Sequence, residues 1–414
     1  MRAVTALIAV AACSAPDADV PPAAQRFPEQ QVARWITTLQ GDHGFGVTGG
    51  DAELHDRSDF VLGEQSVWLQ TAGRGAPATL FALGLPAIDV TGGVPKIWIK
   101  LDDVQRATTL ELWLGSDRLA NAFVFPFTSR QAQRWTTEGD WVAFTLPWSL
   151  VRTVGAPDPT AITDVAWRIA DDATGPVRLH VNGLGLVSEP AHGIVSFTFD
   201  DNLESIYLDA APVLAAYGFG ATAYVIAESV DQPGRATLDE LHQLQDAGWE
   251  IAAHAYAAAT HAAELQSLAP ADVEADLVAI RDWLRDHDFH GYDHLAYPHG
   301  GFAGTDTDVL AIVRKYFATA RTIVRSREVW PPSDPEKLRV FYVTDVTPLA
   351  EALAAVDLAA EHHEWIVFVF HRLVAGPPVQ RTEWAAGDFA KLVEHVRASG
   401  MPVETMGQVV EEAQ

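Results

Sequence analysis

The sequence predicts two domains of different fold class, an all-β sandwich followed by a barrel of alternating strands and helices. The chain has 414 residues, which is more than one ordinary hydrophobic core accommodates. Its first half contains short runs in which apolar and polar residues alternate, whereas its second half alternates strand-like runs with helix-like ones. We place the two domains at residues 26–188 and 189–414, because the spacing of apolar residues along the sequence changes between them.

The first domain, residues 26–188, is predicted to consist of short antiparallel strands. Alternating runs are bounded by Gly, Pro, Asp and Asn, for example at residues 97–101, 110–114, 141–146 and 179–184. This spacing favours a β-sandwich, and no catalytic motif lies in this half. The domain resembles the jelly-roll modules that accompany extracellular carbohydrate enzymes. Seven tryptophans could stack on sugar rings if exposed, although an aromatic residue in a strand more often packs in the core: Trp68, Trp98, Trp113, Trp135, Trp141, Trp148 and Trp167. A carbohydrate-binding module and a simple spacer both remain open.

The second domain, residues 189–414, is predicted to be a parallel barrel. Its strand-like runs are short and strongly apolar, at residues 194–199, 221–226, 249–253, 294–297, 318–324, 338–343 and 365–370. Amphipathic stretches separate them, one beginning with a capping box at Thr237 and Glu240. Another places four apolar residues on one helical stripe: Val273, Leu277, Ile280 and Leu284. Seven or eight such units favour a barrel, in which reactive groups lie at the carboxyl ends of the strands.

The composition excludes two classes of partner. Asp and Glu number 55 against 28 Lys and Arg, which gives a formal net charge of −27. This charge repels nucleic acid and anionic lipid headgroups, so we expect neither to bind the folded part. It serves solubility or suits a cationic partner such as a polysaccharide with free amines. The single cysteine, Cys13, excludes an intrachain disulfide, and the oligomeric state is not encoded in any pattern that we recognise.

The first 13 residues resemble a bacterial signal peptide. Arg2 precedes an apolar run at residues 3–12, which is far shorter than the roughly 20 residues that a membrane-spanning helix needs. Residues 10–13, Val-Ala-Ala-Cys, resemble the lipobox of bacterial lipoproteins, which implies lipidation of Cys13. A Pro- and Ala-rich linker follows at residues 14–25. We expect an exported protein, either a cell-envelope lipoprotein that touches the membrane only through this anchor or a secreted protein.

Unusual polar residues follow three of the predicted barrel strands. Asp200 and Asp201 come directly after one strand, His254 after a second and His371 after a third. One such residue alone is more often a structural hydrogen-bonding group, but a barrel brings all three strand ends to one rim. One carboxylate and two imidazoles are a plausible ligand set for a catalytic metal, since they leave coordination positions open for water and substrate.

Three motifs of the second domain resemble those of one enzyme family. Residues 198–201, Thr-Phe-Asp-Asp, look like the first motif of the polysaccharide deacetylases, the NodB-homology or carbohydrate esterase family 4 fold. Residues 296–300, Ala-Tyr-Pro-His-Gly, are similar to the third motif, and the strand before His371 resembles the last one. The resemblance covers about residues 194–410 and implies a distorted (β/α) barrel.

The resemblance also implies a role for each polar residue. Asp200 would be the general base, His371 the general acid, and Asp201, His254 and His261 the metal ligands. The metal would be divalent, with zinc favoured, and would acidify a water molecule and polarise the acetyl carbonyl. A carboxylate can take the proton of that water, and an imidazole can deliver one near neutral pH.

The segment of the third motif is expected to contact the substrate, through Tyr297, Pro298, His299 and Gly300. A backbone N–H of this segment could help to hold the oxyanion. The motif departs from its common form, in which an arginine that orients the base stands two residues before the proline; this chain has Ala296 there. Arg321 could supply that charge instead, or it could form a surface salt bridge. Asp345 is a weaker candidate for orienting His371.

The second motif departs from the family pattern as well. Its histidines are usually four residues apart, but His254 and His261 are seven apart. Seven residues of continuous helix rise about 10.5 Å, which is too far for two imidazoles to share one metal. We therefore expect residues 255–260 to form a loop.

These observations predict a hydrolase that removes acetyl groups from an acetylated polysaccharide, acting on carbon–nitrogen bonds other than peptide bonds. The amide activity is favoured because it is the commoner one in the family that the sequence resembles. An esterase for O-acetyl groups of the xylan type is the first alternative. A non-catalytic carbohydrate-binding surface lipoprotein and a hydrolase of small amides are others. The two-domain pattern also predicts that the barrel folds without residues 1–187.

Overall fold

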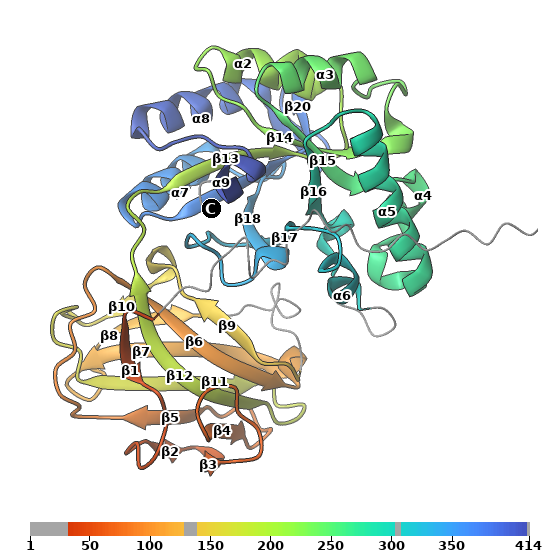
Figure 1. Ribbon diagram of the computed structural model, residues 1–414. Coiled ribbons are helices and arrows are strands. Elements are labelled where there is room, and N and C mark those ends of the chain that lie inside the picture. Colours follow the sequence, from red (N-terminus) through yellow and green to blue (C-terminus); the bar gives the residue numbers. More distant parts are fainter. Residues whose placement is uncertain (1–31, 128–138, 303–307, 412–414) are drawn as a thin grey trace, which may run out of the picture.

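The computed structural model describes residues 32–127, 139–302 and 308–411, which form two bodies joined by a short connection (Figure 1). The predicted signal peptide with Cys13, the linker at residues 14–25, and Trp135 lie outside the described residues. Within the described ranges, no helix has the length and apolar character required to cross a membrane.

Two antiparallel six-stranded sheets make up the first body. The first sheet has the order β3 (Gly50–Asp56), β4 (Ser66–Thr71), β12 (Arg178–Ser188), β6 (Gly93–Asp102) and β9 (Val142–Thr145), with β1 (Arg34–Thr37) also paired to β12. The second has the order β10 (Arg152–Val154), β8 (Asn121–Pro126), β7 (Ala107–Ser116), β11 (Asp164–Asp171), β5 (Ala78–Ala82) and β2 (Gly46–Thr48). Alternate residues of both sheets belong to one apolar core, for example Leu112 and Leu179. The more specific expectation, that this sandwich is a jelly roll, stays a prediction.

Seven parallel strands close into a barrel in the second body. They are β13 (Ile194–Phe199), β14 (Thr222–Ile226), β15 (Glu250–Ala255), β16 (Gly291–Ala296), β17 (Thr319–Arg325), β18 (Leu338–Tyr342) and β19 (Trp365–Phe370). Every strand predicted from the sequence is present, and the first and last have the predicted bounds. All residues of β13 and β19 are buried, because the barrel interior covers one face and helices cover the other.

Helices separate the barrel strands in the sequence or follow the last one, and most of them cover the barrel from outside (Figure 1). Met406 and Val409 of the final helix instead belong to one apolar cluster with Tyr224 and Val367 of the strands. They are α2 (Ala211–Ala215), α3 (Leu238–Asp246), α4 (Ala258–Ala263), α5 (Pro270–Asp286), α6 (Val309–Val313), α7 (Leu349–Glu361), α8 (Ala386–Ser399) and α9 (Met406–Glu411). The predicted capping box begins α3, where Thr237 Oγ1 accepts from Glu240 N and Thr237 N donates to Glu240. The predicted apolar stripe of α5 is fully buried. A small parallel pair, β20 (Arg372–Val374) and β21 (Glu383–Ala385), follows β19.

The first body packs against the amino ends of β18 and β19. Glu364, just before β19, accepts hydrogen bonds from Ser149 N at 3.0 Å and from Arg327 Nε at 3.0 Å. The hydroxyls of Thr145 and Ser333 lie 2.8 Å apart across the same interface. A small apolar cluster of Val94, Val187 and Val329 lies beside them. The carboxyl ends of the barrel strands are therefore left for the site described next.

Candidate active site

The paired aspartates stand at the carboxyl end of β13, in a sharply turned segment. Asp200 is buried, and its backbone N donates to Phe370 O at 3.0 Å. Asp201 and Asn202 have φ of 68° and 40°, a left-handed conformation that Asp and Asn tolerate better than most residues. Arg235 donates to the Asp201 carbonyl, and Asn202 Oδ1 accepts from Ile226 N at 3.1 Å. These contacts fix the turn that places the Asp201 carboxylate.

His254 lies near the end of β15 and is held in one ring orientation. Its Nδ1 is 2.8 Å from the carbonyl oxygen of Ala296 at the end of β16. Since a carbonyl can only accept, Nδ1 carries the proton and the lone pair of Nε2 points away from it. Burial lowers the pKa of His254 to about 4, although the Asp200 charge opposes this, so the ring is neutral at pH 7. A neutral imidazole with a fixed tautomer is the form that binds a metal.

His261 belongs to α4, so the expectation of a loop throughout residues 255–260 was wrong in part. Strand β15 ends at Ala255 and α4 begins at Ala258, leaving only two residues outside both elements. The backbone N–H groups of Tyr256 and Ala257 donate to the Asp276 carboxylate of α5 at 2.8 and 2.9 Å. Asp276 thus holds the turn directly after β15, so that α4 begins within the segment that was expected to be a loop. The two histidines are still on separate elements, as their spacing required.

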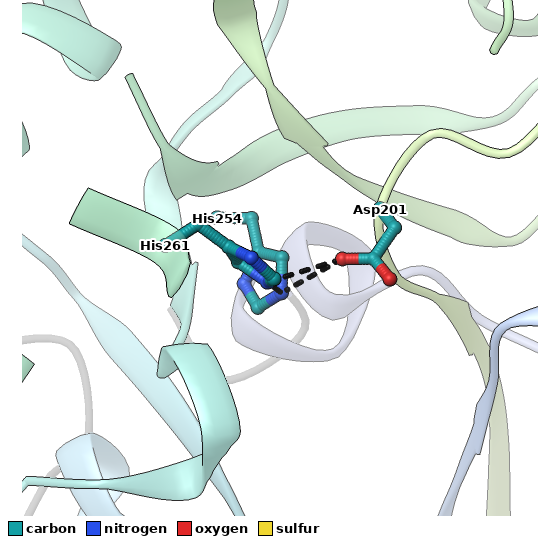
Figure 2. Close-up of side chains that lie close together, drawn as sticks. All are labelled: Asp201, His254 and His261. Atoms are coloured by element: carbon teal, nitrogen blue, oxygen red, sulfur yellow. Dashed lines mark hydrogen bonds and ion pairs between the residues drawn. The ribbon is translucent and has the colours of Figure 1, made fainter. Parts of the chain in front are cut away.

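Side-chain atoms of Asp201, His254 and His261 converge on one point (Figure 2). His261 Nε2 is 3.1 Å from Asp201 Oδ1 and 3.2 Å from His254 Nε2. His254 Nε2 is 3.6 Å from Asp201 Oδ1. Ligand atoms at about 2.0–2.1 Å from a tetrahedral zinc ion are about 3.3 Å apart, which matches these separations. Asp201 Oδ1 is buried yet accepts no hydrogen bond from the described residues. The donor set therefore fits a divalent cation.

Asp200 lies next to these three residues and is paired with Arg321 of β17. Arg321 is fully buried and its Nη2 donates to Asp200 Oδ1, so the alternative of a surface salt bridge is wrong. Its side chain points into the barrel, where its guanidinium lies 4.7 Å from the ring centroid of Tyr224. Burial raises the pKa of Asp200, but the Arg321 charge, followed by those of His254 and His371, outweighs burial and holds the pKa below its usual value. Asp200 is therefore an ionised, buried carboxylate.

His371 follows β19 on the other side of Asp200. Its Nε2 is 3.7 Å from Asp200 Oδ2, and its ring packs edge-on against Tyr342 with centroids 5.6 Å apart. Its Nδ1 is buried and has no hydrogen-bond partner in the described part of the chain. The expected orienting contact with Asp345 is thus not formed; the backbone N of Asp345 instead donates to Arg381 O at 3.1 Å.

The segment of Tyr297 to Gly300 borders the site, but its side chains differ in how accessible they are to a substrate. Tyr297 is buried and its hydroxyl donates to Glu336 O at 2.9 Å, so its side chain cannot contact a substrate as expected. Pro298 is buried as well. His299 is exposed, with φ of 55°, and its Nε2 lies 2.9 Å from His261 O. Among the four predicted substrate contacts, His299 offers the most accessible side chain.

Three supporting residues were not singled out from the sequence. Tyr224 lies under the Arg321 guanidinium, Asp276 sets the start of α4, and Arg235 holds the Asp201 turn. Tyr224 and Asp276 carried a weak signal, because each is a polar side chain within an otherwise apolar strand or helix stripe. Arg235 lies in a polar loop and carried none.

Comparison with known proteins finds relatives of the segment that carries most of this site. The family model described as polysaccharide deacetylase matches residues 188–319. YxkH of Bacillus subtilis (strain 168), whose name places it provisionally among the polysaccharide deacetylases, is 30% identical over 115 residues, 28% of this chain. The match spans about two fifths of that relative, 39% of its length.

Solved structures with some likeness include carbohydrate esterases. The Xyl-CE4 domain of a multidomain xylanase from the hindgut metagenome of Trinervitermes trinervoides is 13% identical, with a TM-score of 0.37, over 53% of this chain and 91% of that one. A family 4 carbohydrate esterase from Streptomyces lividans is 16% identical, with a TM-score of 0.35, over 50% and 90%. The assignment rests on the sequence matches rather than on these low scores.

The matched segment contains Asp200, Asp201, His254 and His261, whereas Arg321 and His371 lie beyond it and are joined to the site by geometry alone. Residues 188–319 of this chain are therefore similar to the polysaccharide deacetylase family.

Proposed function

We propose that the protein is a metal-dependent hydrolase that removes acetyl groups, N-acetyl groups in particular, from a polysaccharide. The observation that carries the proposal is the convergence of Asp201, His254 and His261 beside the buried pair of Asp200 and Arg321. A carboxylate, two imidazoles and an adjacent ionised carboxylate form the donor set of a hydrolytic metal site.

Asp201, His254 and His261 would hold the cation, and zinc suits their oxygen and nitrogen donors and their spacing best. When bound, the metal would lower the pKa of a water molecule and polarise the acetyl carbonyl. The Ala296 carbonyl keeps His254 Nε2 directed at the cation site. The turn held by Arg235 does the same for the Asp201 carboxylate.

Asp200 would accept the proton of the attacking water. Its Oδ1 is occupied by Arg321, which leaves Oδ2, the oxygen nearer His371, to take the proton. Arg321 keeps the buried carboxylate ionised and prevents it from rotating out of position. The arginine thus takes the place of the one that many family members carry two residues before the proline, where this chain has Ala296.

His371 would protonate the leaving nitrogen. Its Nε2 lies 3.7 Å from Asp200 Oδ2, so the base and the acid border the same space. Water adds to the acetyl carbon, the carbon–nitrogen bond breaks, and His371 supplies the proton that the departing amine requires. The products are acetate and a free amine on the sugar.

A backbone amide near His299 would stabilise the oxyanion. The Tyr297 N–H already donates to Arg321 O at 3.1 Å and the Gly300 N–H to Tyr297 O at 2.9 Å. Pro298 has no N–H, so the His299 amide is the remaining donor of this segment, and its left-handed backbone sets the direction in which it points.

Acetate release from matched substrates tests the proposal. We expect release from an N-acetylglucosamine oligomer and a loss of about 10³-fold in kcat for Asp200→Asn with an unchanged circular dichroism spectrum. Release from acetylated xylan alone would assign the O-acetyl esterase, and turnover of a small acetamide alone would assign a small-amide hydrolase. Wild-type protein inactive on all three would overturn the enzymatic proposal.

We also propose that the protein is exported and anchored through Cys13. Cell fractionation would find the wild type with membranes and Cys13→Ser in the soluble envelope or medium fraction. A wild-type protein found only in the medium would assign a simple secretory signal instead.

A further inference from the structure

The second sheet of the first body carries a built pocket on the face that points away from the apolar core. We propose that it binds a pyranose unit bearing a carboxylate, as in a uronic-acid-containing glycan. The pocket has a volume of about 240 Å³ and is lined by Thr79, Trp113, Leu119, Ala166 and Arg168. This inference goes beyond the proposed hydrolase site, because the pocket lies on the body that contributes none of the catalytic residues.

The strand register explains how the pocket forms. Ala166 of β11 pairs with Trp113 of β7 on one side and with Phe81 of β5 on the other. Residues paired in this way point to the same face, so a small side chain stands between two aromatic ones. Ala166 forms the floor and Trp113 a wall. One row further along, Arg168 pairs with Thr79, which places a cation and a hydroxyl at the edge.

The turn that contributes Leu119 to the pocket has a strained backbone. Asp117, Arg118 and Leu119 have φ of 53°, 56° and 66°, three successive left-handed residues of which none is glycine. Such a conformation is unfavourable for residues other than glycine and persists only where the surroundings enforce it. The buried Asp164 enforces it, since its Oδ2 accepts from Leu119 N at 3.1 Å and its Oδ1 from Gly84 N at 2.9 Å. These contacts hold the turn between β7 and β8 so that Leu119 lies at the rim of the pocket.

The aromatic wall is fixed before any ligand binds. Trp113 Nε1 donates to Glu111 at 2.9 Å, and Arg152 donates to the other oxygen of the same carboxylate at 2.8 Å. The Arg152 guanidinium lies 5.1 Å from the Trp113 ring centroid. These contacts fix the Trp113 ring, and the charges of Glu111 and Arg152 neutralise each other. A rigid indole is a suitable surface for the apolar face of a sugar ring.

Arg168 gives the pocket its charge preference. It is exposed, its guanidinium lies 6.0 Å from the Trp113 ring centroid, and it forms no ion pair with any described residue. Its cross-strand neighbour Glu111 is already paired with Arg152, which leaves the Arg168 guanidinium available to a ligand. A guanidinium binds a carboxylate through two parallel hydrogen bonds, so it would select an acidic sugar over a neutral one. A glycan held here would also raise the concentration of its acetylated units near the barrel.

Calorimetric titration of the full chain with two matched tetrasaccharides tests the inference. One is cellotetraose, and the other is its β-1,4-linked glucuronate counterpart, in which each hydroxymethyl group is replaced by a carboxylate. We expect the acidic tetramer to bind at least tenfold more tightly than the neutral one. Trp113→Ala should abolish binding of both, and Arg168→Gln should weaken only the acidic tetramer, by about tenfold.

Trp68→Ala is the matched control. Trp68 is also half-buried on an outer sheet face, and the Arg178 guanidinium lies 4.2 Å from its ring centroid. It does not line the pocket. We expect Trp68→Ala to bind both tetramers as the wild type does. Trp113→Phe, which keeps an aromatic wall, should retain binding and guards against loss of fold. Absence of binding by the wild type, equal binding of both tetramers, or an equal loss in Trp68→Ala would each overturn the inference. Neither probe is acetylated, so the outcome does not depend on the proposed hydrolase activity.

Discussion

The two ends of the barrel both carry buried polar side chains, but these side chains differ in how they are partnered. At the carboxyl end, several polar atoms lack hydrogen-bond partners among the described residues: Asp201 Oδ1, His371 Nδ1, and Nε and Nη1 of Arg321. At the amino end, Glu328 accepts from Arg339 Nε at 2.8 Å and Nη2 at 2.7 Å, and Glu364 accepts from Ser149 and Arg327.

This difference distinguishes the end of the barrel that needs a ligand from the end that contacts the first body. A buried polar atom without a partner costs free energy, so a cluster of such atoms indicates that something absent from the protein chain, such as a metal, water or substrate, completes it. Buried charges that already satisfy one another need no ligand. This difference supports the proposed reactive site at the carboxyl end, whereas the amino end joins the barrel to the first body.

The largest expected effect comes from removing a ligand at the carboxyl end. His261→Ala leaves two of the three converging groups and opens the cation site, so we expect acetate release to fall by at least about 10³-fold. Metal content of the purified protein, measured by atomic emission, should fall with it. His395→Ala is the matched control and should keep both, because His395 is a half-buried histidine that pairs with Asp357 on the barrel surface. Retention of full activity by His261→Ala would exclude His261 as a ligand.

A smaller loss is expected at Arg321, which acts through Asp200. Arg321→Lys keeps a positive charge but cannot reproduce the planar guanidinium, so we expect kcat to fall by about 10- to 100-fold with KM and metal content little changed. Arg321→Gln should lose more than Arg321→Lys, because a buried carboxylate is then left without a cation. Equal activity of wild type and both variants would show that Arg321 is only a core residue.

At the amino end the expected effect is on stability rather than on catalysis. Arg327→Met leaves the buried Glu364 without its cation, which should lower the free energy of unfolding by about 3 kcal/mol. The urea midpoint measures this, and kcat of the folded protein should not change. The double variant Arg327→Met/Glu364→Leu replaces the pair by apolar groups and should recover most of the loss. A double variant no more stable than Arg327→Met would contradict the interpretation that Arg327 and Glu364 neutralise each other where the two bodies meet.

One residue near the amino end is an exception, and it predicts a pH effect. Burial, and then the neighbouring Asp334 charge, raise the pKa of Glu336 to about 8, and its Oε1 is buried with no partner among the residues described. The folded state thus holds a proton that the unfolded state releases at lower pH, so stability declines as the pH rises from about 5 to 8. Glu336→Gln should therefore melt several degrees higher than wild type at pH 8 and about equally at pH 5. A constant difference between the two proteins would refute this.

Much of the barrel and its site was predictable because strong local signals coincide there. Strands β13 and β19 are unbroken apolar runs ended by aspartate or histidine, so both the elements and the positions of Asp200, Asp201 and His371 follow from the sequence. The burial of Arg321 did not follow, because a strand covered on both faces has no polar face to mark which side chains point inward. The early start of α4 depends on Asp276, a residue of another helix, and the burial of Tyr297 depends on a backbone carbonyl at Glu336.

The contact between the two bodies was also beyond the sequence. Glu364, Arg327, Glu328 and Arg339 stand in separate segments and meet only once the barrel is closed, so no local pattern marks them as an interface. The expectation that the barrel folds without residues 1–187 remains a prediction. The buried contact of Ser149 with Glu364 argues against it, since truncation would expose an ion pair and an apolar cluster that the first body covers.

Calorimetric titration of the metal-free protein with zinc tests most directly whether Asp201, His254 and His261 form a metal site. We expect one zinc ion per chain, and a loss of affinity of at least about 100-fold in Asp201→Ala with the fold preserved. Binding of zinc by Asp201→Ala with the affinity and stoichiometry of the wild type would contradict the proposed site.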